Sequence, residues 1–478
     1  MGTRLCALSA VALSRGLAER AYSADDVAKD LLDLIDDRNV ALNALVTLDR
    51  ADVLAQATAS AERYRCGAAL SPLDGVPVSV KDNLWVRGVR ATWGSRLFET
   101  FVPDRDEIAV ERLRAAGAVI LGKTNTPEFA MASVTENPVF GVTRNPLDLA
   151  LTPGGSSGGA AAQIASGMGP LALVTDAGGS TRRPASFCGI VGFKPGIGTV
   201  PRTGGFPPLA HDFQVVGTLA RSVADVRVMH RVIAGADSRD PSSVTTPPGD
   251  RLGARKVLFA VSLGGHPVDK PCREAAVAAV KAMSSLGYDV EPVEDLWDPD
   301  EVEELFGLLI RVGVARAVAP HNDWQTRVTP PIRSLAEQGA VISATQYLDA
   351  LDRIRALREA FDRRMVDVHS LVTPVAASGA WSIGYPAPPS IEGKDVPASA
   401  GRIFSTAVNL LGLPALSIPA AIDEAGMPFG AQIVMARQRD CALLDLGVKL
   451  EDRLAFDHLK TAPQKTLKEK MNAGNNGS

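Results

Sequence analysis

The fold is decided by a glycine- and serine-rich stretch, residues 151–198, which reads LTPGGSSGGAAAQIASGMGPLALVTDAGGSTRRPASFCGIVGFKPGIG. It holds two Gly-Ser clusters, residues 154–159 and 177–182, separated by an Ala-rich segment and a short apolar run. Glycine carries no Cβ, so backbone amides in such clusters approach a ligand closely. Serine hydroxyls beside exposed amides are the groups from which acyl-transfer sites are built. The stretch therefore indicates two loops that form one acyl-transfer site.

Further segments accompany this stretch. Residues 73–83 read LDGVPVSVKDN, and residues 122–130 read GKTNTPEFA. Residues 409–419 read NLLGLPALSIP, and residues 428–432 read PFGAQ. Taken in this order with the two clusters, they resemble the amidase signature family of serine hydrolases. The resemblance covers most of the chain.

The resemblance implies a single large α/β domain, in which a mixed, twisted central sheet is covered by helices on both faces. Residues 1–70 are expected to form an N-terminal helical region that packs on the core. Residues 71–458 would form the amidase signature domain, and residues 459–478 a polar C-terminal tail. Ser23 and Asp26 are spaced as a capping box, which independently predicts a helix from residue 23 to residue 39.

Hydrophobic patterns predict the elements around the site. Residues 76–122 are typical of a β-α-β unit, with Lys81 at the end of its first strand. Strand ends are where open α/β sheets place their sites. Helices are expected over residues 157–165 and 223–233, and a long helix over residues 344–368. Strands are expected over residues 171–175 and 190–195. A loop is expected over residues 207–217, and a loop that covers the substrate over residues 374–398.

The base of this site is predicted to be a lysine. Amide hydrolysis needs a group that takes the proton of the nucleophile, and histidine usually supplies it. The six histidines all lie outside the glycine-rich stretch. Lysine replaces histidine where burial lowers its pKa enough to leave the amine neutral. Lys81 follows an apolar run, which favours such a buried position.

The resemblance implies a role for each site residue. Ser180 is the nucleophile, Ser156 is the bridging serine, and Lys81 is the base that takes the proton through Ser156. It also implies a cis peptide bond between Gly155 and Ser156. The oxyanion hole would be the backbone amides of Ala177, Gly178, Gly179 and Ser180, and the supporting residues would be Ser157, Asp176 and Arg182.

The expected substrate is a small molecule with a linear amide-type C–N bond, which can be a carboxamide, an anilide or a carbamate. Aromatic and methionine side chains in segments that border the site favour an apolar acyl pocket, and Met131, Phe206 and Trp381 are its candidate lining. Met131 is also an ordinary core residue by type. Neither a cofactor nor a metal ion is expected.

Two other enzyme functions remain open. Residues 155–159 also fit G-x-S-x-G, the nucleophile elbow of α/β-hydrolase esterases, with Ser157 as the nucleophile. That elbow requires a strand directly before it, and residues 145–153 make a poor strand. The second function is the glutaminase subunit of a tRNA-dependent amidotransferase, which shares the signature. Residues 196–200 read GIGTV, where such subunits typically carry a tyrosine and an arginine.

Composition excludes several other classes. The formal net charge of −4 gives no basic face for nucleic acid. No run of residues reaches the length of a membrane span, and the apolar residues 5–13 are expected to form a short helix rather than a signal peptide. The five cysteines form no CxxC pair, so neither a disulfide framework nor a zinc site is indicated. We expect a cytoplasmic monomer or homodimer.

Overall fold

The computed structural model describes residues 5–245 and 254–456. Its main strands are β1 (Leu45–Thr47), β2 (Pro77–Lys81), β3 (Val119–Thr124), β6 (Leu171–Asp176), β7 (Val191–Lys194), β8 (Val215–Ala220), β9 (Lys256–Phe259), β10 (Asp289–Pro292), β11 (Val368–Pro374), β12 (Ala415–Ile422) and β13 (Pro428–Val434). Within the described residues they form one eleven-stranded sheet in the order β1-β3-β2-β6-β8-β7-β12-β13-β11-β9-β10. A small separate hairpin pairs β4 (Glu136–Asn137) with β5 (Gly141–Val142).

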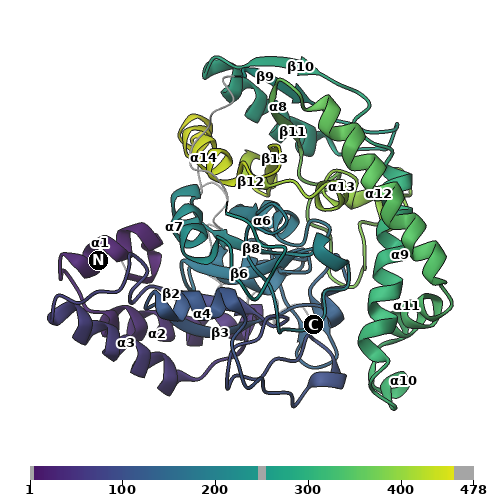
Figure 1. Cartoon of the computed structure of the whole chain (residues 1–478). Helices are drawn as coiled ribbons and strands as arrows, with labels where there is room; N and C mark the ends of the chain where they lie inside the picture. The colour runs from purple at the N-terminus through teal and green to yellow at the C-terminus, as the bar shows by residue number, and fades with distance from the viewer. Residues whose placement is uncertain (1–4, 246–253, 457–478) are drawn as a thin grey trace, which may run out of the picture.

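The helices are α1 (Ala10–Ala18), α2 (Ala24–Leu42), α3 (Arg50–Arg65), α4 (Ile108–Ala115), α5 (Gly158–Ala165), α6 (Arg182–Cys188), α7 (Val223–Ile233), α8 (Lys270–Ser285), α9 (Pro299–Val318), α10 (Trp324–Arg327), α11 (Pro330–Ala340), α12 (Ala344–Arg364), α13 (Thr406–Leu410) and α14 (Asp440–Leu454). Helices α7, α8 and α14 pack together over one part of the sheet, and α5 packs against α6. A mixed sheet flanked by helices confirms the fold class predicted from the sequence (Figure 1).

The sheet is mixed because parallel and antiparallel pairs meet near its centre. Strand β2 runs parallel to both β3 and β6, so the β-α-β unit predicted for residues 76–122 is confirmed. Strand β12 runs antiparallel to β7 and β13. Parallel neighbours end at the same edge of a sheet, so the carboxyl ends of β2 and β6 lie side by side. This arrangement brings Lys81 next to the loop that begins at Asp176.

The N-terminal helices α1, α2 and α3 lie together at one end of the molecule (Figure 1). Helix α2 begins with the predicted capping box, in which the Ser23 side chain accepts from the Asp26 amide and Asp26 accepts from the Ser23 amide. None of the helices among the described residues has the length and apolar character needed to cross a membrane.

Three expectations about local structure need correction or fall outside the described residues. Residues 215–217, expected in a loop, begin strand β8, which pairs with β6 and β7 deep in the sheet. The long helix expected over residues 344–368 ends at Arg364, because the chain turns there to start the buried strand β11 at Val368. The tail expected over residues 459–478 lies outside the described residues.

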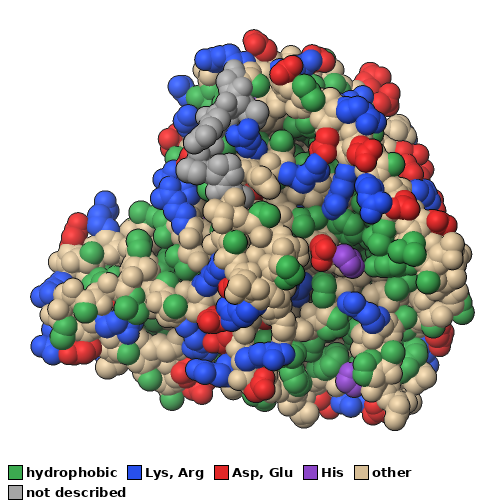
Figure 2. All heavy atoms as spheres, in the orientation of Figure 1, with side chains coloured by type: hydrophobic (Ala, Val, Ile, Leu, Met, Phe, Trp, Pro, Cys, Tyr) green, Lys and Arg blue, Asp and Glu red, His purple; other side chains and the backbone are tan. Residues whose placement is uncertain are grey.

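Helices α9 to α12 form an arm beside the sheet (Figure 1). Figure 2 shows hydrophobic side chains gathered where this arm faces the rest of the molecule. Helix α9 packs closely on α11, and Gly339 allows the close approach, whereas Gly313 of α9 allows the loop at Leu209 to approach. A Cβ at Gly339 would collide with the backbone carbonyl of Arg311, and one at Gly313 would collide with the backbone of Leu209.

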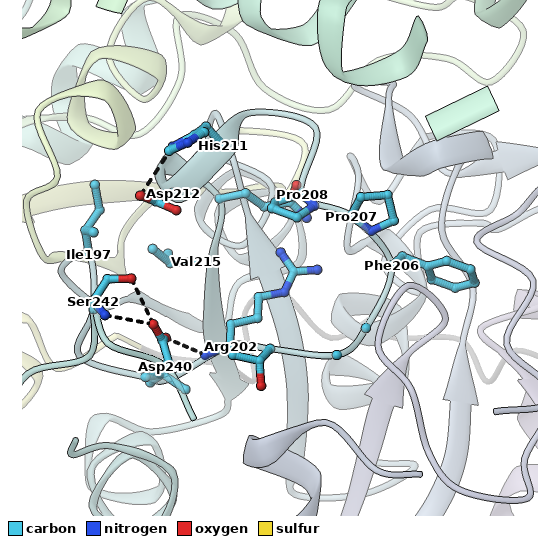
Figure 3. A pocket seen from close by; sticks show the side chains of 16 residues that line it. Ile197, Arg202, Phe206, Pro207, Pro208, His211, Asp212, Val215, Asp240 and Ser242 are labelled. Atoms are coloured by element: carbon cyan, nitrogen blue, oxygen red, sulfur yellow. Dashed lines mark hydrogen bonds and ion pairs between the residues drawn. The ribbon is translucent and has the colours of Figure 1, made fainter. Parts of the chain in front are cut away.

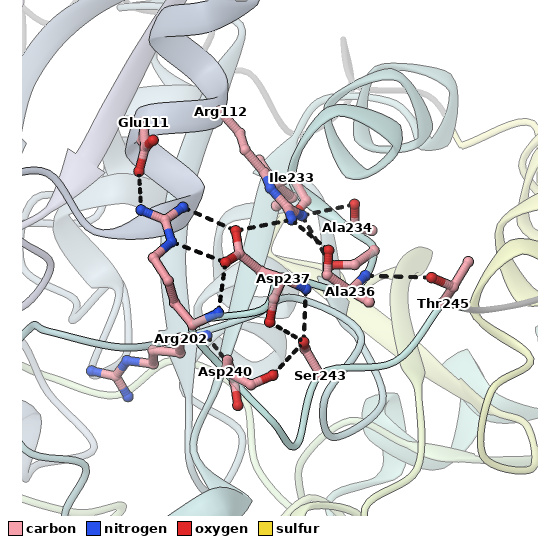
Figure 4. Close-up of polar contacts among 12 residues, drawn as sticks. Glu111, Arg112, Arg202, Ile233, Ala234, Ala236, Asp237, Asp240, Ser243 and Thr245 are labelled. Carbon is pink, nitrogen blue, oxygen red and sulfur yellow. Dashed lines mark hydrogen bonds and ion pairs between the residues drawn. The ribbon is translucent and has the colours of Figure 1, made fainter.

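An arginine network fixes the segment after α7. The Arg112 guanidinium donates to the backbone carbonyls of Ile233, Ala234 and Gly235 at the end of that helix. Arg239 bridges Asp237 and Glu111, and both of these carboxylates are labelled in Figure 4. These contacts join α4 to the segment that continues to Asp240. The Asp240 carboxylate accepts a hydrogen bond from the backbone amide of Arg202. The loop after β7 is therefore connected to α4 through Asp240 and the segment that follows α7.

Candidate active site

Lys81 lies at the carboxyl end of β2 and is completely buried. Its Nζ atom is 2.7 Å from Ser156 Oγ, 3.0 Å from Ser157 Oγ and 3.3 Å from Thr175 Oγ1. Asn83 Nδ2 donates to Thr175 Oγ1 over 2.8 Å. The amine therefore contacts three hydroxyl groups, and among the described residues it forms no ion pair.

Burial lowers the pKa of Lys81 well below its ordinary value. The negative charge of Asp176 opposes this change, and the positive charge of Arg202 adds to it. A buried ammonium without a carboxylate partner is costly, so the neutral amine is favoured. A neutral amine has a lone pair that accepts a proton, which is the property that general-base catalysis requires.

The first Gly-Ser cluster places Ser156 against this amine. The peptide bond between Gly155 and Ser156 is cis, as the resemblance implies. A Cβ on Gly155 would lie 2.5 Å from the backbone oxygens of Ala132 and Val134, so only glycine fits there. The Ser157 amide donates to the carbonyl of Ser180 over 3.2 Å. This bond joins the two clusters and brings both predicted serines into one site.

The second cluster is a loop wrapped around the carboxylate of Asp176. Its Oδ1 accepts from the Gly179 amide at 2.7 Å, and its Oδ2 accepts from the Thr181 amide at 3.0 Å. The Gly179 amide, expected in the oxyanion hole, is thus engaged by this carboxylate. Ala177 is only partly buried, and the Ser180 residue keeps 9% of its surface exposed.

Arg182 holds this loop to distant parts of the chain. It pairs with Asp176 through two hydrogen bonds of 2.9 and 3.1 Å. It also donates to Gln432 Oε1 on β13 at 2.6 Å, and to Asn409 Oδ1 on α13. Burial alone would raise the pKa of Asp176, but the charge and hydrogen bonds of Arg182, together with the Lys194 charge and the Thr181 amide, hold that pKa well below its usual range. Both side chains are fully buried and paired with each other.

The three candidate pocket residues do not lie in one cluster. Phe206 stacks on Trp93, with ring centroids 4.8 Å apart, within a group of aromatic side chains. Met131 is partly buried and packs against the same large core as Phe206. Trp381 instead packs edge-on against Phe187, at 5.6 Å, in a small separate cluster. The structure therefore brings Met131 and Phe206 to one core and Trp381 to another.

A cavity of about 130 Å³ lies beside the loop after β7 and is lined in part by Phe206, Arg202 and Asp212. Figure 3 shows the Arg202 side chain extending between Pro208 and Phe206. Its guanidinium pairs with the buried Glu107 at 3.5 Å. The charge of this arginine contributes to lowering the pKa of Lys81, so the cavity wall is electrostatically coupled to the Lys81 amine.

Several residues of the site were missed by the sequence analysis. Thr175 and Asn83 complete the polar surroundings of the Lys81 amine. Arg183, the residue after Arg182, is buried and donates to Ser133 Oγ and to the Gly155 carbonyl. The signal for Arg183 was the double arginine directly after the second cluster, because two adjacent arginines point to different partners. Asn83 ends the quoted segment 73–83 and Thr175 ends the expected strand 171–175, but neither was assigned a contact with the site.

Two other kinds of site, a nucleophile elbow at Ser157 and a metal site, can be compared with the structure. Within the described residues, no strand directly precedes Ser157: residues 152–157 are irregular, and α5 begins at Gly158. A nucleophile elbow needs that strand. The described part of the chain holds no group of three or more His, Cys, Asp or Glu side chains that could bind a metal ion.

Known proteins resemble this chain over nearly its whole length. A family model described as Amidase matches residues 26–444. The chain is 37% identical over 473 residues to a glutamyl-tRNA(Gln) amidotransferase subunit of Symbiobacterium thermophilum, covering 92% of this chain and 95% of that one. It is 33% identical to the subunit of the same name from Picosynechococcus sp., covering 87% of this chain and 91% of that one.

Solved structures agree with this fold. A bacterial aryl acylamidase of the amidase signature enzymes superimposes with a TM-score of 0.89, covering 97% of this chain and 100% of that chain; at 24% identity it supports the fold alone. The 6-aminohexanoate cyclic dimer hydrolase complexed with substrate gives a TM-score of 0.83 at 26% identity, covering 95% and 98%. Because the family model and the curated relatives span most of its length, this protein belongs to the amidase signature family.

Proposed function

We propose that this amidase signature hydrolase cleaves a linear amide-type C–N bond through a seryl acyl-enzyme. The observation that carries the proposal is the 2.7 Å contact between the Lys81 amine and the Ser156 hydroxyl, both of them buried. Because burial lowers the pKa of Lys81, the amine can take a proton at neutral pH. Ser180 lies in the loop joined to Ser157 and is the proposed nucleophile.

In the acylation step, one proton leaves Ser180 and one proton is returned to the leaving nitrogen. Ser180 Oγ attacks the amide carbonyl carbon, its proton passes to Ser156 Oγ, and the proton of Ser156 passes to Lys81 Nζ. The resulting oxyanion accepts from backbone amides, for which we propose Ala177, Gly178 and Ser180, since Gly179 already donates to Asp176. The C–N bond then breaks, and the same proton returns through Ser156 to the leaving nitrogen.

Deacylation repeats these steps with water. A water molecule attacks the acyl carbon and gives its proton to the Ser156–Lys81 pair, and that proton returns to Ser180 as the product acid leaves. A carbamate would follow the same route through a carbamoylated or carbonate-type serine. The partly buried Met131 and the neighbouring aromatic core support an apolar wall for the acyl group.

Kinetics of the Ser180→Ala variant test the proposal. We expect turnover to be lost, with a fall in kcat of at least about 10³-fold, because the covalent route has no nucleophile. The unfolding transition should stay that of the parent protein, because the Asp176 carboxylate holds this loop through the amides of Gly179 and Thr181. Substantial remaining turnover would refute the role of Ser180. Loss of activity in Ser157→Ala with Ser180→Ala still active would favour the elbow esterase instead.

A second candidate function is that of a glutaminase subunit in an amidotransferase. The curated relatives at 37% and 33% identity are named as subunits of a glutamyl-tRNA(Gln) amidotransferase. Against it stands the loop at residues 196–200, which lacks the tyrosine and arginine typical of such subunits. A hydrolysis panel of glutamine, primary amides, p-nitroanilides, ureas and aryl carbamates separates the two. Turnover of glutamine that requires a partner protein would favour the amidotransferase function, and turnover of the other amides by this chain alone would favour the stand-alone hydrolase.

A further inference from the structure

The peptide unit between Gly178 and Gly179, in the loop of the proposed nucleophile, is held at both of its polar groups. The Gly179 amide donates to Asp176 Oδ1 at 2.7 Å. The Gly178 carbonyl accepts from the Ser405 hydroxyl at 3.0 Å. This peptide bond is trans, and the C=O and N–H groups of a trans peptide point in opposite directions. The two hydrogen bonds therefore fix the orientation of the whole unit.

Ser405 reaches this loop from a distant part of the chain. It directly precedes α13, lies 227 residues after Gly178 and is completely buried. Its Oγ atom also lies 3.3 Å from the carbonyl of Arg402, but a hydroxyl carries one proton, and the contact with Gly178 is the shorter one. A Cβ on Gly179 would lie 2.3 Å from Ser405 Oγ. Glycine at residue 179 therefore leaves the space that this hydroxyl occupies.

The two neighbouring peptide units of the loop are held by their carbonyls as well. The Asp176 carbonyl accepts from Asn409 Nδ2 on α13 at 2.9 Å, so the Ala177 amide of the same unit points away from α13. The Gly179 carbonyl accepts from an amide in the first turn of α6 at 2.9 Å, so the Ser180 amide points away from that helix. These units thus have their carbonyls engaged by the rest of the protein and their amides on the opposite side, which is the arrangement that an oxyanion hole needs.

The unit between Gly178 and Gly179 depends most on such a contact. Glycine has no Cβ, so a peptide unit between two glycines rotates with little steric cost. Gly179 has a φ of +105°, a conformation that favours glycine. Rotation of this unit would shift the adjacent amides of Gly178 and Ser180. Donors of an oxyanion hole stabilise the transition state most when they are in place before the oxyanion forms, so a loosely held unit would slow the reaction.

We propose that Ser405 is a positioning residue of the oxyanion hole, because its hydroxyl fixes the Gly178 carbonyl and thereby aims the amides of Gly178 and Ser180. This inference rests on the proposed function, because it adds a residue from the C-terminal part of the chain to the same site. Ser405 acts through the loop and not by contact with the substrate. Its hydroxyl should therefore affect the stabilisation of the transition state more than the binding of the substrate.

Kinetics of Ser405→Ala test the inference on a p-nitroanilide that the parent enzyme hydrolyses. We expect kcat to fall by about 10- to 100-fold while KM stays within about twofold of the parent value. The trifluoromethyl ketone with the same acyl group forms a tetrahedral adduct with a serine nucleophile, and its affinity should fall by a factor similar to that of kcat. A raised KM with unchanged kcat, or an unchanged affinity for the ketone, would overturn the inference.

A matched control separates positioning of the loop from a general structural role. Thr406 is also buried, and its hydroxyl donates to the Arg402 carbonyl at 3.3 Å, so Thr406→Val should leave kcat within about twofold. Ser405→Thr keeps a hydroxyl at the position and should retain most of kcat, which tests the inference even if Ser405→Ala does not fold. Equal losses of kcat in Ser405→Ala and Thr406→Val, or in Ser405→Ala and Ser405→Thr, would overturn the inference. If the parent enzyme hydrolyses no amide of the panel, the proposed function fails, and this inference fails with it.

Discussion

At the scale of single residues, the site depends on which buried charged side chains are paired with one another. Asp176 and Arg182 neutralise each other in a fully buried pair, which leaves Lys81 among hydroxyl groups. Removing one partner of a buried pair typically costs about 3–5 kcal/mol, because the other charge is left uncompensated. The same pair therefore shapes the loop that carries Ser180.

The pH dependence of the reaction is a prediction at this scale. The proposed base form of Lys81 is the neutral amine, so kcat/KM should fall as the pH falls through its lowered pKa, where the amine becomes protonated. Lys81→Ala should reduce kcat by about 10³-fold or more at neutral pH and should remove this acidic limb from the profile. A pH–rate profile of both proteins checks this. A limb that survives in the variant would assign the titration to another group.

The predictability of the site differs from residue to residue. Lys81, Ser156 and Ser180 lie in contiguous motifs, so their sequence context was enough to propose them. The contacts of Arg182 with Gln432 and Asn409 join residues more than two hundred positions apart, and no local pattern encodes such pairs. The hydrogen bond from the Gly179 amide to Asp176 likewise depends on the loop conformation. A glycine-rich sequence does not determine that conformation, because glycine adopts many backbone conformations.

At the scale of elements, regular hydrophobic patterns predicted the helices over residues 157–165 and 223–233 and the strands around the site. Helix α7 was predicted at its observed bounds, and β2 within one residue. Strand β8 was missed because prolines and glycines precede it, and they indicated a longer loop. The end of α12 was misplaced because no glycine or proline follows Arg364 before Pro374 to mark it. Tertiary pairing, rather than propensity, fixed both boundaries.

The contact between α9 and α11 gives a prediction at the element scale. Gly339→Ala should lower the free energy of unfolding by about 1–3 kcal/mol, because its Cβ would collide with the Arg311 carbonyl across the helix pair. Gly307→Ala in α9 is the matched control: its Cβ would meet only Arg311 Nη1, at 3.5 Å. The control should be stabilised by about 0.5–1 kcal/mol, since alanine favours a helix over glycine. Denaturant unfolding measures both, and equal shifts would argue against the close packing.

At the scale of the whole molecule, the sheet joins segments that are far apart in the sequence. Strands β12 and β13 enter between β7 and β11, so the C-terminal part of the chain completes the centre of the sheet. Sequence patterns predict strands but not this order, because the order depends on which strands pair across long connections. The fold class was nevertheless predictable, since the family motifs run through most of the chain.

The pH dependence of global stability is a prediction at this largest scale. Burial raises the pKa of Glu451, on α14, from 4.5 to about 7. Both of its oxygens accept from the Val223 amide at the start of α7. Because the folded state holds this proton more tightly than the unfolded state, the free energy of unfolding should fall as the pH rises from about 4.5 to about 7. Glu451→Gln should flatten this slope in urea titrations; an unchanged slope would exclude Glu451 as its source.

The central claim is that Ser180 becomes a covalent nucleophile because a neutral Lys81 withdraws its proton through Ser156. Peptide mass spectrometry after reaction with a fluorophosphonate tests it most directly. The account predicts a single adduct on Ser180 in the parent protein and much slower labelling in Lys81→Ala. An adduct on Ser157, or labelling of Ser180 at the same rate without Lys81, would contradict it.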